Sequence, residues 1–166
     1  MYQLSHKIIV IGPSGSGKST LAIKLSKILS LPIYHLDNIW WNKDKSHISR
    51  DEFDIKLSNI LSEDNWIIDG DYSRTYEVRM EASKTIIYLD FPLEFCLKSV
   101  EDRVGQYRPD IPWVEDNFDP EFKEWIIGWF NKTRPRLLEL IEKYKNNKQI
   151  IIFHNREEVE EFIKSI

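Results

Sequence analysis

The chain has 166 residues, of which 42% are hydrophobic and 13% aromatic, so it can form one domain with a substantial core. This composition excludes an intrinsically disordered chain. The formal net charge of −4 argues against a typical DNA-binding protein, which carries a basic surplus or a basic face.

Short β-branched runs alternate with amphipathic helical patterns in the first half of the chain. The run Ile-Ile-Val-Ile at 8–11 is continuously apolar, as expected of a strand buried on both faces, and it ends at Gly12. In chain order, the patterns predict a strand at 8–11, a helix from Lys18, a strand at 33–36, a helix over 50–62 and a strand at 66–68.

The second half continues the alternation around one irregular segment. Residues 104–117 hold a glycine and two prolines and are predicted to be a loop. Pro135 is expected in the first turn of a helix, where no backbone N–H is needed. Alternating strands and helices predict an α/β fold with a parallel sheet and helices on both faces. The predicted elements are a strand at 85–89, a helix carrying Leu93 to Val100, helices around 122–130 and 135–144, a strand at 150–153 and a helix carrying Val159 to Ile166.

Residues 12–20, Gly-Pro-Ser-Gly-Ser-Gly-Lys-Ser-Thr, match every fixed position of the phosphate-binding motif G-x-x-x-x-G-K-[ST]. Such a loop turns successive backbone N–H groups toward a phosphate, and the following helix adds the positive end of its dipole. We expect Lys18 to reach the β- and γ-phosphates and the Ser19 hydroxyl to bind Mg²⁺, so the predicted cofactors are ATP and Mg²⁺. The predicted nucleotide-binding residues are Gly12, Ser14, Gly15, Ser16, Gly17, Lys18, Ser19 and Thr20.

Three classes of protein carry this motif, and the rest of the sequence favours one. A GTPase needs N-K-x-D, but the stretch from Asn131 to Arg134 lacks the aspartate. A motor or AAA-type ATPase needs a strand that ends in Asp-Glu, and neither Asp69-Gly70 nor Asp90-Phe91 supplies the glutamate. Small-molecule and nucleotide kinases need a short core, an acceptor pocket after the second strand and an arginine-rich lid, which fits this chain.

Two aspartates follow predicted strands and are candidate site residues. Asp37 comes directly after the second strand and Asp69 after the third, so both should face the phosphate loop. Asp37 is predicted to bind the acceptor, where it accepts a proton from the acceptor hydroxyl or fixes its orientation, and Asp69 to serve the Mg²⁺ site. The alternatives are a helix-capping role for Asp37 and a simple Asp-Gly turn for Asp69.

Arginines and tryptophans complete the candidate site. Arg103 and Arg134, with Arg108 and Arg136, are predicted to stabilise transferred charge, and Arg74 to bind the acceptor. The alternative is that these arginines are solvated surface residues. Adjacent tryptophans cannot both face one buried side, so one of them, taken as Trp41, is expected to stack on the acceptor while Trp40 packs in the core. Trp125 and Trp129, four apart on a helix, are expected to be packing residues.

Four blocks of the sequence resemble the bacterial DNA topology modulation proteins, which are similar to adenylate kinase. The blocks are the phosphate loop, His-Leu-Asp-Asn-Ile-Trp-Trp at 35–41, Trp-Ile-Ile-Asp-Gly-Asp-Tyr at 66–72 and Tyr-Leu-Asp-Phe-Pro at 88–92. The resemblance implies a three-layer P-loop NTPase fold with strand order 2-3-1-4-5 over residues 1–166 and a helical lid insertion at about 104–134. It also implies that Arg74 touches the acceptor and that 154–156 lies beside the adenine.

Two functions follow from the sequence. The first is a kinase that transfers the ATP γ-phosphate to a small hydroxyl acceptor such as a nucleoside or nucleotide. The second, suggested by the resemblance, is an ATP-dependent regulatory protein that affects DNA topology, although the acidic balance does not support direct DNA contact. A single cysteine, Cys96, and the lack of an apolar run of ~18 residues predict a cytoplasmic protein with no membrane partner.

Overall fold

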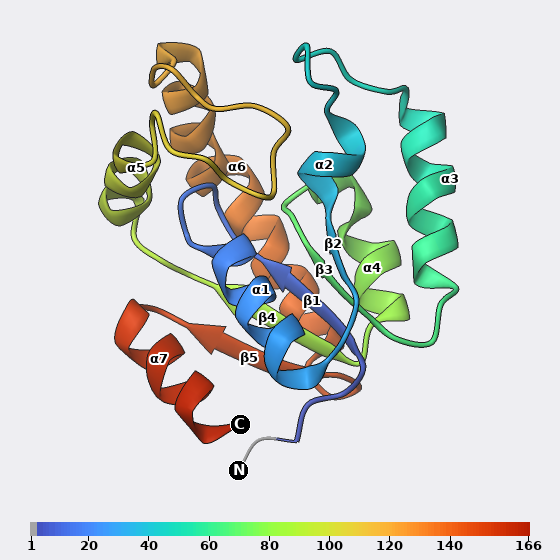
Figure 1. Ribbon diagram of the computed structural model, residues 1–166. Coiled ribbons are helices and arrows are strands. Elements are labelled where there is room, and N and C mark those ends of the chain that lie inside the picture. The colour runs from blue at the N-terminus through green and yellow to red at the C-terminus, as the bar shows by residue number, and fades with distance from the viewer. Residues whose placement is uncertain (1–2) are drawn as a thin grey trace.

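A computed structural model describes residues 3–166 as a parallel five-stranded sheet flanked by helices (Figure 1). The strand order is β2-β3-β1-β4-β5, which confirms the predicted order. All neighbouring strands pair in parallel, so their carboxyl ends meet at one edge of the sheet. The strands are β1 (Lys7–Ile11), β2 (Ile33–His35), β3 (Trp66–Asp69), β4 (Thr85–Leu89) and β5 (Gln149–Phe153).

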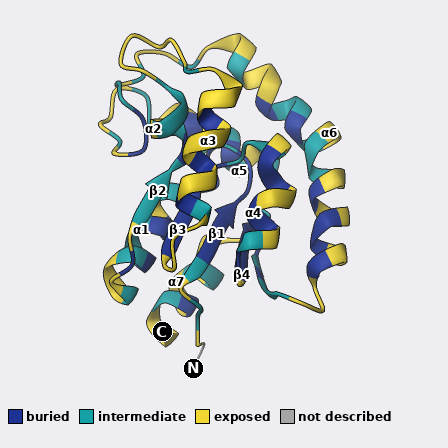
Figure 2. Ribbon diagram, turned by 90° about the vertical axis from the view of Figure 1, so that its right-hand side faces the viewer, coloured by how far each residue is buried: buried dark blue, intermediate teal, exposed yellow. Residues whose placement is uncertain are grey.

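The helices cover both faces of this sheet and bury an apolar side against it (Figure 2). One core cluster lies between the sheet and α3, α4 and α6, and the other between the sheet and α1, α5 and α7. Neighbouring residues of β1, such as Ile8 and Ile9, point into opposite clusters, as the two-residue period of a strand requires. The helices are α1 (Lys18–Leu29), α2 (Leu36–Trp40), α3 (Arg50–Leu61), α4 (Tyr76–Ala82), α5 (Leu93–Asp102), α6 (Pro120–Tyr144) and α7 (Arg156–Ser165).

The longest helix differs from the sequence prediction. Two helices were expected around 122–130 and 135–144, but α6 runs without a break from Pro120 to Tyr144 and includes Pro135 in its interior. Proline there removes one hydrogen bond of the helix. Buried residues on both sides of it, among them Trp129 and Leu137, pack against the same core cluster and hold the two halves in line. Tertiary packing therefore outweighs the local cost of the proline.

Three short elements were not predicted. Residues 36–40 form the helix α2 instead of extending β2, so Asp37 lies in the first turn of this helix rather than at a strand end. A 3-10 turn, η1 (Ser73–Thr75), and the helix α4 follow β3. The sequence of α4 mixes charged and apolar residues, and its Tyr76, Arg79 and Met80 are buried at helical spacing, which is the signal that the sequence offered.

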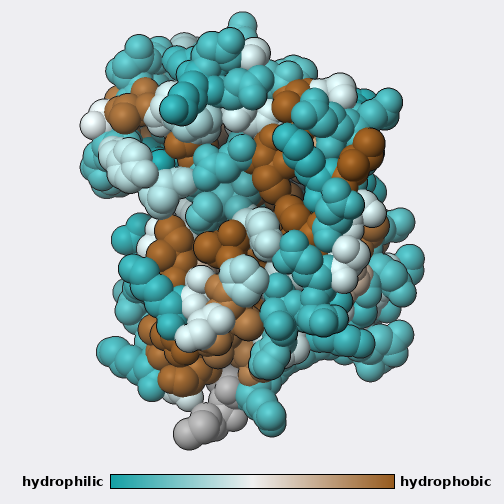
Figure 3. All heavy atoms as spheres, turned by 45° about the vertical axis from the view of Figure 1, so that its right-hand side comes forward, coloured by the Kyte–Doolittle hydropathy of each residue, from teal (hydrophilic) through white to brown (hydrophobic). Residues whose placement is uncertain are grey.

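The surface of the molecule carries both hydrophilic and hydrophobic side chains. On the face drawn in Figure 3, hydrophilic side chains cover most of the periphery, while hydrophobic ones gather in the middle and at the lower left of the view. Within residues 3–166, no helix combines the length and the apolar character that a bilayer crossing requires.

Candidate active site

The phosphate loop joins β1 to α1 and depends on glycine for its shape. Gly12, Gly15 and Gly17 all have positive φ angles, of 149°, 81° and 90°. A Cβ atom on Gly15 would lie 2.3 Å from the carbonyl oxygen of Cys96 in α5, and one on Gly12 would lie 2.8 Å from that of Leu89. Glycine is therefore required both by the backbone conformation and by the close approach of two other elements.

Lys18 is the first residue of α1, and its ammonium group lies inside the loop. Its Nζ donates a hydrogen bond of 2.9 Å to the carbonyl oxygen of Pro13, which also accepts a 2.7 Å bond from the Ser16 hydroxyl. Burial lowers the pKa of Lys18, while the charges of Asp71, Asp37 and Asp69 act to raise it. A buried cation among carboxylates is a strong site for phosphate oxygens once they enter.

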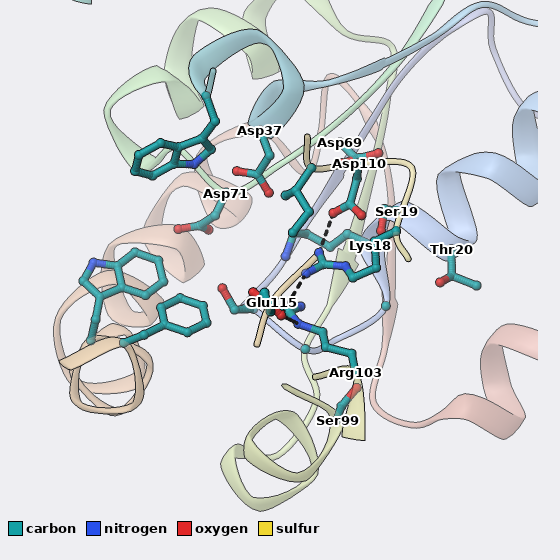
Figure 4. A pocket seen from close by; sticks show the side chains of 18 of the residues that line it. Lys18, Ser19, Thr20, Asp37, Asp69, Asp71, Ser99, Arg103, Asp110 and Glu115 are labelled. Atoms are coloured by element: carbon teal, nitrogen blue, oxygen red, sulfur yellow. Dashed lines mark hydrogen bonds and ion pairs between the residues drawn. The ribbon is translucent and has the colours of Figure 1, made fainter. Parts of the chain in front are cut away.

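The structure brings both predicted aspartates to Lys18. Figure 4 shows Asp37 of α2 directed toward Lys18, and Asp69 at the end of β3 is near enough for its charge to act on the pKa of the lysine. Asp37 Oδ1 accepts a 2.8 Å hydrogen bond from the Tyr72 hydroxyl, and Asp69 Oδ2 contacts His35 Nδ1. Burial raises the pKa of Asp37, which the Tyr72 hydrogen bond and Lys18 oppose. Burial acts to lower the pKa of His35, but Asp69 outweighs it and raises the pKa overall.

Two further carboxylates in this region were missed by the sequence reading. Asp71 follows the Asp69-Gly70 turn and accepts hydrogen bonds from the Tyr76 hydroxyl and, at 2.8 Å, from Trp129 Nε1. Asp110 comes from the 104–117 loop, is only 5% exposed, and has a buried Oδ1 without a hydrogen-bond partner among residues 3–166. The position of Asp71 beside the Asp69-Gly70 turn could have indicated that it lies in the site. The position of Asp110 depends on how the 104–117 loop folds over the cleft, which the sequence does not show.

A fully buried arginine holds the turn that carries Asp71. Arg79 of α4 is 0% exposed. Its Nε donates a 2.9 Å hydrogen bond to Thr75 Oγ1, and its Nη1 a 3.0 Å bond to the Gly70 carbonyl oxygen. Its Nη2 also donates to the Asp71 carbonyl oxygen. No role was predicted for Arg79 from the sequence, and in the structure it supports the β3–α4 connection.

The predicted lid arginines are engaged with carboxylates of their own loop. Arg103, at the end of α5, donates from Nε to Glu115 at 3.0 Å. Arg108 donates from Nη2 to Asp110 at 2.6 Å and lies 3.5 Å from Glu115. Figure 4 shows Asp110, Glu115 and Arg103 joined through Arg108 by a series of interactions beside Lys18. These guanidinium groups thus line the cleft with their charge already paired.

The other predicted arginines lie farther from the loop. Arg134 forms two hydrogen bonds of 2.9 Å with Asp90, the residue after β4, and it is absent from the lining of the cleft that contains Lys18. Arg136 is exposed and contacts the Ser73 carbonyl oxygen at 3.4 Å. Arg74 lies at the rim of the cleft, where Asp54 of α3 binds it through two hydrogen bonds of 3.0 and 2.7 Å.

One cleft of about 1670 Å³ contains these groups and has an aromatic wall. Trp41 meets Trp113 of the loop edge to face at 5.5 Å, and both line the cleft. Trp129 is buried as expected, but Trp125 is 52% exposed and lines the cleft, so the expectation that it packs in the core was wrong. Trp40 is half-buried and stacks on His47 at 4.3 Å.

The cleft is closed on one side by the 104–117 loop. In Figure 1 this segment reaches from α5 toward α2, and Asn38 Nδ2 donates a 2.7 Å hydrogen bond to the Pro109 carbonyl oxygen. At the opposite end Arg156 lies over the ring of Phe95, at 5.1 Å from its centroid, and both line the cleft. The lining therefore joins the phosphate loop to α2 and to the start of α7.

The residues present fit a nucleoside triphosphate with Mg²⁺. The loop amides, Lys18 and the start of α1 form an anion site, and the Ser19 hydroxyl and Asp69 line the same cleft with oxygen atoms that could bind the metal. All of the predicted loop residues from Gly15 to Thr20 except buried Ser16 line the cleft, as does Ser14. Arg156 and Phe95 offer a flat surface for a base.

Comparisons with known proteins agree with the fold. No family model and no curated protein sequence matches the chain. A gluconokinase from Sinorhizobium meliloti 1021 matches with a TM-score of 0.60 at 13% identity, over 98% of this chain and 90% of that one. A shikimate kinase from Acinetobacter baumannii, in complex with shikimate, matches with a TM-score of 0.61 at 15% identity, over 97% and 90%.

A deoxyadenosine kinase from M. mycoides with bound dCTP matches with a TM-score of 0.50 at 16% identity, over 95% of this chain and 96% of that one. The comparisons do not show the DNA topology modulation family that the sequence blocks resemble. At these identities the similarity shows the fold alone. The chain therefore has the α/β P-loop NTPase fold, with a five-stranded parallel sheet and helices on both faces.

Proposed function

We propose that this protein is a small-molecule kinase, which transfers the γ-phosphoryl group of Mg²⁺-bound ATP to a hydroxyl group of a small acceptor. The observation that carries the proposal is the single cleft in which Lys18 and the carboxylate of Asp37 face one another. Its volume of about 1670 Å³ exceeds the ~300–1,000 Å³ of a pocket for one small ligand. It has room for a nucleotide and an acceptor together.

The residues divide the chemical work between them. Lys18 and the loop amides hold the β- and γ-phosphates, and the metal bound near Ser19 and Asp69 would neutralise their charge. Asp37 accepts a hydrogen bond from the acceptor hydroxyl and takes its proton, because its buried carboxylate has a raised pKa and is directed into the cleft. Arg103 lines the same cleft and would stabilise the charge that develops on the transferred group.

The strand ends favour transfer over hydrolysis. A hydrolase of this fold places a glutamate after a strand to orient the attacking water. Here β3 ends at Asp69 and is followed by glycine, and Asp90 after β4 is held by Arg134 outside the cleft. The fold shared with gluconokinase and shikimate kinase supports the same reading.

The test is a panel of small hydroxyl compounds with ATP and Mg²⁺, read as ADP release and as a phosphorylated product by mass spectrometry. We expect at least one acceptor to raise ADP release well above basal hydrolysis and to gain one phosphoryl group. Lys18→Ala, which lacks the phosphate-binding cation, is the negative control. ADP release that no acceptor stimulates would contradict the proposal.

A further inference from the structure

Asp37 and Trp41 place a carboxylate and an indole ring at a fixed spacing on the wall of the cleft where we expect the acceptor to bind. The backbone N–H of Trp41 bonds the carbonyl oxygen of Asp37 at 3.0 Å, so the two residues are one helical turn apart. Side chains at this spacing project to the same side, with Cβ atoms roughly 5–6 Å apart. Both side chains line the cleft. A ligand whose hydroxyl meets Asp37 therefore has Trp41 beside it.

Trp41 has no parallel stacking partner within residues 3–166. Its aromatic neighbours Trp40, His47 and Trp113 meet it at interplanar angles of 77°, 81° and 87°. Across the cleft, Trp125 is 52% exposed and stacks on Phe122 at 17°. Indole rings exposed in a cleft are suited to a flat ligand, because stacking buries both faces that water would otherwise cover.

The charges on this side disfavour an anionic acceptor. The half-buried carboxylates of Asp37 and Asp71 both line the cleft, so a phosphate or carboxylate on the acceptor would be repelled there. The arginine at the rim, Arg74, is already bound at two points by Asp54. Lys45 and Arg50 are exposed at the rim, where solvent screens their attraction.

The loop side offers no free positive charge to replace Arg74. Arg103 and Arg108 are paired with Glu115 and Asp110. Two buried atoms of this lining have no hydrogen-bond partner among the described residues: Oδ1 of Asp110, which calls for a donor, and Nη1 of Arg108, which lies 3.5 Å from Glu115 and calls for an acceptor. A neutral hydroxyl group can meet both.

From these contacts we infer that the acceptor is an uncharged compound with a hydroxyl group and a flat unsaturated ring, of the nucleoside type, rather than a phosphorylated compound or a sugar acid. The inference rests on the proposed kinase function and names the substrate class of the same site. The acceptor oxygen forms a bond to the γ-phosphorus while the bond from that phosphorus to the β–γ bridging oxygen breaks. ADP leaves, and the hydroxyl proton passes to Asp37 and then to solvent, so that ATP and acceptor give ADP, a phosphomonoester and H⁺.

The experiment compares three groups of acceptors with ATP and Mg²⁺: ribo- and deoxyribonucleosides, their 5′-monophosphates, and sugar acids including gluconate and shikimate. We expect a nucleoside to be phosphorylated with a kcat/KM at least 10-fold above that of its monophosphate. Turnover of monophosphates or sugar acids in preference to nucleosides would overturn the inference and leave the kinase function standing.

A binding measurement distinguishes failure of the proposed kinase function from failure of the inferred substrate class. With a non-hydrolysable ATP analogue and Mg²⁺, nucleosides are titrated while tryptophan fluorescence is followed. Nucleoside binding without any phosphorylated product would contradict the kinase function and keep the substrate class. Binding of monophosphates as tight as that of nucleosides, or no nucleoside binding, would overturn the inference.

Two matched pairs of variants test the stacking and charge contributions. Trp41→Leu should weaken nucleoside binding about 10-fold, while Trp41→Phe, which keeps a flat ring, should retain most of it. Asp54→Ala frees Arg74 and should strengthen monophosphate binding about 10-fold without changing nucleoside binding. Glu52→Ala, which removes another exposed carboxylate of α3, should change neither. An equal loss in both Trp41 variants, or no response to Asp54→Ala, would count against the inference.

Discussion

The indole Nε1 of Trp129 donates a 2.8 Å hydrogen bond to Oδ2 of Asp71. This bond joins the middle of α6 to the turn after β3, although the two residues are 58 positions apart in sequence. It fixes a carboxylate that acts on the pKa of Lys18, and it connects that carboxylate to the helix that begins directly after the 104–117 loop.

Replacing Trp129 by phenylalanine removes the N–H donor and keeps a large aromatic ring. We expect the free energy of unfolding to fall by about 1.5–3 kcal/mol, because a buried carboxylate loses a hydrogen bond. Denaturation by urea measures the change. Trp125→Phe on the same helix is the control, since Trp125 is 52% exposed, and its stability should stay within about 0.5 kcal/mol of the parent. Equal effects of the two substitutions would contradict the prediction.

Replacing Lys18 by alanine should weaken ATP and ADP binding about 100-fold, equivalent to about 2.7 kcal/mol. The reason is that Lys18 supplies the buried cation of the phosphate loop. Isothermal titration calorimetry gives the dissociation constants. Lys24→Ala lies on the same helix but is exposed and paired with Glu160, so its nucleotide affinity should match that of the parent. Unchanged affinity in Lys18→Ala would show that the loop does not bind phosphate through this residue.

Tyr72→Phe should move the acidic limb of the kcat profile to higher pH. The Tyr72 hydroxyl stabilises the ionised form of Asp37 and so lowers its pKa, against the effect of burial. Without that hydrogen bond the pKa of Asp37 rises further, and more protons compete for the base at a given pH, so activity is lost earlier as the pH falls. Steady-state rates at saturating acceptor between about pH 4 and pH 8 measure the shift.

Tyr88→Phe is the control for this profile. The Tyr88 hydroxyl donates a 2.7 Å hydrogen bond to Asp90, which lies outside the lining of the main cleft. Its removal should leave the limb in place. A limb that shifts equally in both variants, or moves to lower pH in Tyr72→Phe, would exclude Asp37 as the titrating base.

Arg79→Met should be among the most destabilising single substitutions in this chain. The methionine fills much of the volume but leaves the Thr75 hydroxyl and two carbonyl oxygens of the 70–72 turn without their donor. Unsatisfied buried polar groups of this number predict a loss of about 3 kcal/mol or more in the free energy of unfolding. Thermal and urea denaturation measure it. Arg136→Met, at an exposed position of α6, should change stability by less than about 0.5 kcal/mol.

Local patterns predicted the sheet because its strands are continuous apolar runs between turn residues. The bounds of β4 agree with the prediction residue for residue, and the glycine-rich loop lies between β1 and α1 as its motif requires. The strand order, which the family resemblance implied, is confirmed by the structure. Such features depend on neighbouring residues and on the twist and handedness of βαβ units, which a sequence carries directly.

The helices α2, α4 and α6 show where local patterns failed. Pro135 reads as a helix start in sequence, yet α6 continues through it because buried residues on both sides pack on one sheet face. Trp125 and Trp129 are four residues apart and were expected to have the same role, but Trp125 is exposed in the cleft and Trp129 is buried. Burial of a given residue depends on which distant element packs against it, and no window of sequence contains that element.

The sequence by itself determined the phosphate loop, the sheet and the direction in which Asp69 faces, because these follow from residue types at fixed short spacings. Only the tertiary structure decided the charge state of the cleft. Arg103, Arg108 and Arg74 all line the cleft, and each is bound by a particular carboxylate that the sequence does not reveal. Pairing between distant side chains depends on the three-dimensional path of the chain, and it sets which positive charges remain for a ligand.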